Sequence, residues 1–135
     1  MADRTLLIQY TVNQRKERPA GLRVWSDGVL QRPAEDNPPP TEAERLDVDR
    51  EIRWTDIRTL TVDQVTAIQV AILSIGFFDL PARLLINYCK EDPGTAIWTA
   101  YVEGRCGRVV VFDPRPKRSP ELDTFSAQLN EIIAR

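Results

Sequence analysis

Few side chains in this sequence are suited to catalysis. Its 135 residues include no histidine, which removes the commonest general base, the usual metal ligand and every catalytic triad that relies on imidazole. Cys106 has Arg105 and Arg108 close by in the sequence, and neighbouring cations lower the pKa of a thiol and activate it as a nucleophile. We favour a simpler interpretation, in which Cys106 is a small residue in a hairpin loop between Gly104 and Gly107.

Neighbouring acids are the second candidate for chemistry, because paired carboxylates can divide acid and base roles between them. The pairs are Glu35/Asp36, Asp47/Asp49 and Glu91/Asp92. All three fall in segments predicted to be loops, where solvated acids are ordinary. No glycine-rich phosphate-binding motif is present. The spacing of Cys89 and Cys106 matches no zinc or redox pattern, so both are expected to be plain thiols. The sequence therefore predicts no catalytic residue, no metal and no cofactor.

Charge is distributed unevenly along the chain. Residues 33–51 contain seven acids and two arginines, whereas residues 105–118 contain one acid and five cations. These cations are Arg105, Arg108, Arg115, Lys117 and Arg118. The two segments could face each other, or the basic loop 113–118 could bind an acidic partner in a salt-dependent manner. The net charge of -2 and the lack of aromatic residues among the cations argue against nucleic acid as the partner.

The three tryptophans, Trp25, Trp54 and Trp98, all fall in predicted strands. Packing in a core is the ordinary role of such residues. If two of them share an exposed face of a sheet, that face becomes the natural surface for a partner protein or a second copy of the chain. The tryptophans and the five cations of 105–118 are therefore the candidate partner-binding residues.

Alternating hydrophobic residues predict the strands that would position these side chains. The predicted strands are 5–12, 22–25, 29–31, 51–59, 82–89, 96–103 and 109–112. Leu7 is the one apolar residue of the first strand that the alternation places on the outer face. Asp27-Gly28 predicts a tight hairpin between the second and third strands.

Two helices complete the predicted elements. Thr61 and Gln64 form a capping box that opens the first helix, and Gly76 ends it. This helix has apolar residues on nearly every side, so we expect it to be buried on most of its surface. Ser119-Pro120 predicts the start of a second helix, which runs to the end of the sequence. The elements predict a two-layer α+β fold, a mostly antiparallel sheet of about six strands packed by two helices.

Length and composition predict one domain, residues 1–135, with a mobile acidic and proline-rich loop at 33–49. The most apolar stretch, residues 65–78, is shorter than the roughly 20 residues of a membrane span. The N-terminus has no features of a secretion signal. We therefore expect a cytoplasmic protein that does not bind membranes.

The layout of turns and helices resembles that of a widespread class of small uncharacterised bacterial α+β domains. The residues that carry the resemblance are the hairpin at 22–29, the helix opening at 60–64, the helix exit at 76–81, the turn at 103–105 and the closing helix from Ser119. The metalloprotease inhibitor emfourin is similar in this layout. The resemblance implies inhibition of a protease as one form of function, and it carries over no inhibitory residue. The acidic proline-rich loop is a departure from the layout.

We therefore predict a non-catalytic protein-binding or assembly domain whose partner is another protein or a second copy. Two alternatives stay open. One is a small enzyme that uses Cys106 or the loop acids, and the other is a binder of an acidic ligand through the basic loop. A homodimer packed through the helix 119–135 is a further possibility.

Overall fold

The computed structural model describes residues 5–13, 17–41, 43–44, 50–80, 83–85, 95–112 and 120–135. They form seven strands, two helices and a short 3₁₀ turn. The strands are β1 Leu6–Asn13, β2 Ala20–Trp25, β3 Val29–Pro33, β4 Trp54–Thr59, β5 Arg83–Leu85, β6 Thr95–Val102 and β7 Arg105–Phe112. The helices are α1 Val62–Ser74 and α2 Pro120–Ala134, and the 3₁₀ turn is Phe77–Asp79.

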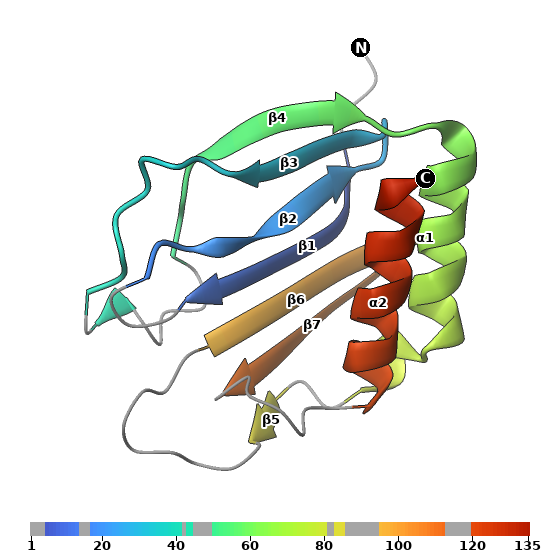
Figure 1. Ribbon diagram of the computed structural model, residues 1–135. Coiled ribbons are helices and arrows are strands. Elements are labelled where there is room, and N and C mark those ends of the chain that lie inside the picture. The colour runs from blue at the N-terminus through green and yellow to red at the C-terminus, as the bar shows by residue number, and fades with distance from the viewer. Residues whose placement is uncertain are drawn as a thin grey trace.

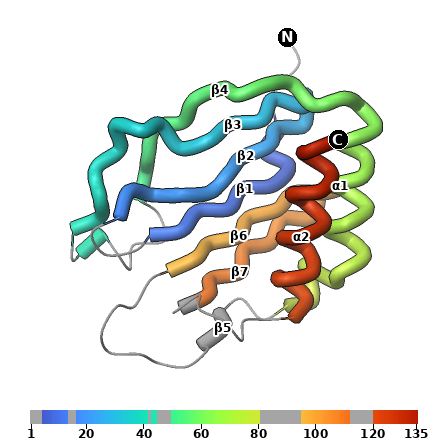
Figure 2. The backbone as a smooth tube through the Cα atoms, viewed as in Figure 1, coloured from blue at the N-terminus to red at the C-terminus, as the bar shows by residue number. Residues whose placement is uncertain are grey.

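All seven strands belong to one sheet, in the order β4-β3-β2-β1-β6-β7-β5. Every neighbouring pair is antiparallel except β5 and β7, which run parallel. Both helices lie side by side on the same side of the sheet (Figures 1 and 2). This confirms the predicted two-layer α+β fold. The opposite face of the sheet, hereafter the open face, is covered by no helix within the described residues.

The core lies between the sheet and α2. Trp98 of β6 is 4 % exposed and stacks on Tyr10 of β1, with 4.0 Å between ring centroids. Its other neighbour is Phe125 of α2, whose ring centroid is 5.5 Å away. Leu122, Phe125, Leu129, Ile132 and Ile133 form the buried face of α2. The second helix is therefore the one that covers the centre of the sheet.

The prediction that α1 is buried on most sides is wrong. Its buried residues are Gln64, Ile68, Ala71 and Ile72, whereas Val62 is 81 % exposed and Val70 56 %. The reason is its place beside α2, which leaves the far side of α1 without a packing partner in the described part of the chain. The stretch Val62–Asp79 has 18 residues and a mean hydropathy of 1.3, so by length and composition it could span a membrane. Core helices of soluble proteins can have the same length and composition. Within that stretch, 28 % is buried.

The predicted capping box of α1 is present. The Gln64 backbone N–H donates to Thr61 Oγ1 at 3.1 Å, and the Thr61 N–H donates to Gln64 Oε1 at 2.8 Å. The Gln64 amide also donates from Nε2 to the carbonyl of Ile132 at 3.0 Å. One side chain thus opens α1 and ties it to the last turn of α2.

Leu7 is buried, at 2 % exposure, although strict alternation placed it on the outer face. The register between β1 and β2 shifts between Leu6 and Ile8, so that the first strand contains a β-bulge. A bulge inserts an extra residue and breaks the two-residue period of the strand. Leu7 and Ile8 can therefore both be buried.

The hairpin loop predicted at Gly104–Gly107 is shorter in the structure. Only Glu103 and Gly104 separate β6 from β7, with φ angles of 53° and 78°. Two successive positive φ angles are typical of the two-residue turns that join antiparallel strands. Strand β7 therefore begins at Arg105, and Cys106 lies in the strand opposite Tyr101 rather than in a loop.

Candidate binding surface on the open face

Strand register aligns one row of polar side chains across the open face. Arg23 of β2 pairs with Gln9 of β1, Gln9 with Thr99 of β6, and Thr99 with Arg108 of β7. On its other side, Arg23 pairs with Gln31 of β3. Side chains at paired positions of neighbouring strands lie on the same face. The row therefore crosses the sheet at right angles to the strands.

The Arg23 guanidinium lies between two tryptophans. Its central carbon is 4.9 Å from the ring centroid of Trp25 and 4.4 Å from that of Trp54. Arg23 Nε and Trp25 Nε1 both donate to Gln31 Oε1, at 2.7 and 2.8 Å. The Gln31 amide in turn donates to Asp56 Oδ1 at 2.6 Å. Stacking between two aromatic faces and these hydrogen bonds hold the cation in one place.

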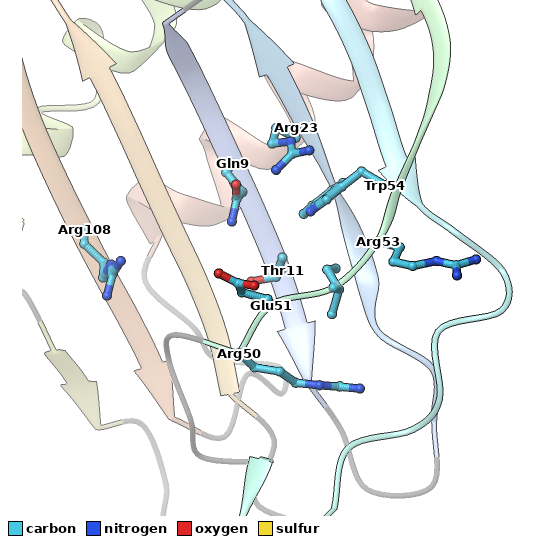
Figure 3. Close-up of a pocket in the computed structure, with 9 residues that line it drawn as sticks. Gln9, Thr11, Arg23, Arg50, Glu51, Arg53, Trp54 and Arg108 are labelled. Carbon is cyan, nitrogen blue, oxygen red and sulfur yellow. The ribbon is translucent and has the colours of Figure 1, made fainter.

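The open face is hollowed beside this stack, with a volume of about 570 Å³. Its walls come from three strands and from the segment 50–54, which crosses the face before β4 (Figure 3). The lining residues are Gln9, Thr11, Arg23, Arg50, Glu51, Ile52, Arg53, Trp54 and Arg108. Four of these nine described residues are arginines and one is an acid, so the described lining has more cations than acids. Two of the arginines, Arg50 and Arg53, are paired with acids outside the lining, Glu44 and Asp36.

Asn37 anchors the segment that forms one wall. Its side chain donates from Nδ2 to the carbonyls of Ala34 and Arg53, both at 2.8 Å, and accepts from the Arg53 N–H at 2.9 Å. Asn37 is 5 % exposed. The Arg53 side chain also forms an ion pair with Asp36. Within the described residues, the start of the proline-rich loop is thus tied to the strand that follows it, while the predicted mobility of 33–49 stays a prediction.

Arg50 has a buried side chain, which is 5 % exposed. It donates to the Pro38 carbonyl at 2.7 Å and to Asn13 Oδ1 at 3.4 Å, and its Nε lies 3.6 Å from Glu44 Oε2. Hydrogen bonds from the backbone and hydroxyl of Thr41, assisted by the charge of Arg50, lower the pKa of the Glu44 carboxyl. Glu44 therefore stays ionised near neutral pH and balances the charge of Arg50.

Glu51 is the one acid among the described residues that line the hollow. Its carboxylate points into the hollow, on the side of Gln9 and Thr11 (Figure 3). The side chain is exposed. A negatively charged ligand would meet this carboxylate as well as the arginines around it.

The structure separates the predicted site residues. Trp25 and Trp54 share the open face with Arg108, which lines the hollow. Trp98 lies in the core, at 4 % exposure, and offers no surface to a partner. The guanidinium of Arg105 lies 4.5 Å from the ring centroid of Phe78, away from the hollow lining. The cations Arg115, Lys117 and Arg118 lie outside the described residues.

Of the residues considered for catalysis, those that the structure describes are not brought together. Cys106 is a free, exposed thiol on β7 and does not line the hollow. Asp36 forms an ion pair with Arg53, and the carbonyl of Glu35 accepts from the Arg18 guanidinium at 2.6 Å. Cys89 and the acid pairs Asp47/Asp49 and Glu91/Asp92 lie outside the described residues. Within the described part of the chain, no three Cys, Asp or Glu side chains gather as metal ligands.

Sequence patterns did not point to most of the hollow. Gln9, Thr11 and Arg23 are polar positions of alternating strands, which is typical of any solvated sheet face. Arg50 and Arg53 flank the acidic loop, where arginines are ordinary loop charge. A signal was present in Trp25 and Trp54, because tryptophans on the polar side of alternating strands indicate an exposed aromatic surface.

No protein-family model, curated protein or solved structure matches the chain.

Proposed function

We propose that this chain is a non-catalytic binding domain that takes an acidic segment of a partner protein in the hollow of its open face. The observation that carries the proposal is the lining of the hollow, which among the described residues contains four arginines, Arg23, Arg50, Arg53 and Arg108, and one acid, Glu51. A cleft of one sign of charge raises the local concentration of oppositely charged partners and speeds their association.

The types of side chain also favour a protein partner. Arginine binds carboxylates through two parallel hydrogen bonds, and tryptophan and arginine are enriched where protein interfaces gain most of their energy. The volume of about 570 Å³ lies within the range of ligand-binding pockets, roughly 300 to 1,000 Å³. Trp54 supplies the aromatic wall and the arginines supply the anion recognition.

The proposal revises where an acidic partner is expected to bind. The sequence pointed to the basic loop 113–118, whereas the hollow uses Arg108 together with arginines from β2 and from the segment 50–53. A cytoplasmic location is part of the proposal. Inhibition of a metalloprotease, which the resemblance to emfourin implied, is one form that such binding could take.

Binding of a polyglutamate peptide to the purified protein tests the proposal. We expect saturable binding that weakens as salt is raised from about 0.05 to 0.5 M, because exposed charges are screened over that range. Arg108→Glu should weaken binding at least tenfold, which is about 1.4 kcal/mol. Arg58→Glu is the matched control, because Arg58 is exposed on β4 and outside the hollow.

Equal losses in the two variants would show that the peptide responds only to net charge and would contradict the proposal. Tighter binding of a single-stranded oligonucleotide than of the peptide would contradict it as well, because the partner would then be a nucleic acid.

A further inference from the structure

Arg23 and Arg108 stand a fixed number of strands apart on the open face. The register runs from Arg23 through Gln9 and Thr99 to Arg108, which is three steps between neighbouring strands. Neighbouring strands are about 4.8 Å apart, so the backbones that carry the two arginines are separated by about 14 Å. Both side chains line the same hollow.

The Arg23 end of this separation is held in place. The guanidinium is stacked between Trp25 and Trp54, and its Nε donates to Gln31 at 2.7 Å. If the Arg23 guanidinium moved toward Arg108, it would lose both its stacking on the tryptophans and its hydrogen bond to Gln31. The positions between the two arginines, Gln9 and Thr99, are uncharged and can donate to a peptide backbone.

An extended peptide matches this separation at one spacing of its acids. Extended chains rise about 3.3 Å per residue, so about 14 Å corresponds to four residues. Side chains of an extended chain alternate, so residues i and i+4 point to the same side. We infer that the hollow recognises an extended segment that crosses the strands and carries two carboxylates four residues apart, one at Arg23 and the other at Arg108.

This inference rests on the proposed function and adds a spacing rule to it. The binding mode differs from addition of a strand at a sheet edge, in which backbone hydrogen bonds supply the affinity. The edge strand β4 has a register shift opposite Leu30 and Gln31, which leaves Ile57 without a paired residue on β3. Such a bulge is a common device against pairing at an edge.

Three peptides test the rule. Each carries two aspartates in a Gly-Ser background, separated by two, four or eight positions, so that charge and length stay constant. We expect the four-residue spacing to bind about five- to tenfold more tightly than the other two spacings, as measured by isothermal titration calorimetry or fluorescence anisotropy.

The double substitution Gln9→Arg with Arg108→Gln moves the second cation without changing composition. It places the two arginines on neighbouring strands, about 4.8 Å apart, so the preference should shift to the two-residue spacing. Circular dichroism checks whether the double variant is folded. If it is not, Arg108→Gln alone should abolish the difference between the spacings.

The outcomes separate the inference from the proposed function. Binding that needs Arg108 but is equal for all three spacings would overturn the spacing rule and leave the proposed function standing. Binding of no peptide, or binding insensitive to Arg108, would overturn both.

Discussion

The arginines of the hollow differ in how their charge is balanced. Arg50 and Arg53 have partners from the acidic loop, Glu44, six residues before Arg50, and Asp36, 17 residues before Arg53. These two pairs join the loop to the wall of the hollow. Glu51 differs from the other two acids because its carboxylate points into the space that a ligand would occupy (Figure 3).

Replacing Glu51 should therefore strengthen binding. Glu51→Gln removes a negative charge from the hollow and keeps the shape of the side chain, so we expect the polyglutamate peptide to bind roughly three- to tenfold more tightly. Asp63→Asn is the control, because it makes the same change of charge at an exposed position on α1. Weaker binding by Glu51→Gln would mean that Glu51 contributes to recognition rather than competing with the ligand.

Two strands, β1 and β2, hold the centre of the polar row, and their close approach depends on one glycine. Gly21 has a φ of 143°, and a Cβ at this position would lie 1.8 Å from the Tyr10 carbonyl oxygen. No rotation of a side chain relieves such a contact, because the obstacle is backbone. Any larger residue in place of Gly21 would therefore disrupt the pairing of this position with Thr11.

Gly21→Ala should destabilise the fold by at least about 2 kcal/mol more than Gly104→Ala, because the backbone of β1 has to move. Gly104 is the matched control, since its φ of 78° is also positive. Apart from its neighbours in the chain, no atom of the described residues lies within 4 Å of a Cβ added there. Urea unfolding of the two variants measures the difference. Similar stabilities would show that β1 and β2 can separate at little cost.

The molecule divides its two faces between stability and binding. The face toward the helices contains the apolar core, in which Phe125 is fully buried against Trp98. The open face contains the hollow and the stacked tryptophans. The apolar side of α2 is buried within its own chain, and its outward side is polar. A homodimer packed through this helix therefore stays a prediction, because α2 exposes no apolar surface that would support it.

This arrangement predicts unequal roles for the two helices. Phe125→Ala should cost about 3 to 5 kcal/mol of stability, because it opens a cavity in the core. Val62→Ala on α1 should stay within about 0.5 kcal/mol, because Val62 is 81 % exposed. Chemical denaturation of both variants checks the comparison. A large loss from Val62→Ala would indicate that a second molecule covers α1 in solution.

The predictions that the structure confirms depend on residues that are neighbours along the chain. The capping box of Thr61 and Gln64 and the tight hairpin at Asp27-Gly28 are formed by residues a few positions apart, so their chemistry can be read directly. Alternating apolar residues likewise predicted the strands and hence the two-layer fold, because a strand that buries one face tends to alternate apolar and polar residues.

What the pattern missed was decided by the packing of distant segments. The bulge that buries Leu7 appears only when β1 is paired with β2. The exposure of α1 follows from the position of α2, which lies about 60 residues further along the chain. The hollow arises because strand register aligns Arg23 with Arg108 and because the segment 50–54 crosses the open face. Local sequence encodes the elements, but the surface that we propose for binding is created only when register brings remote side chains into one row.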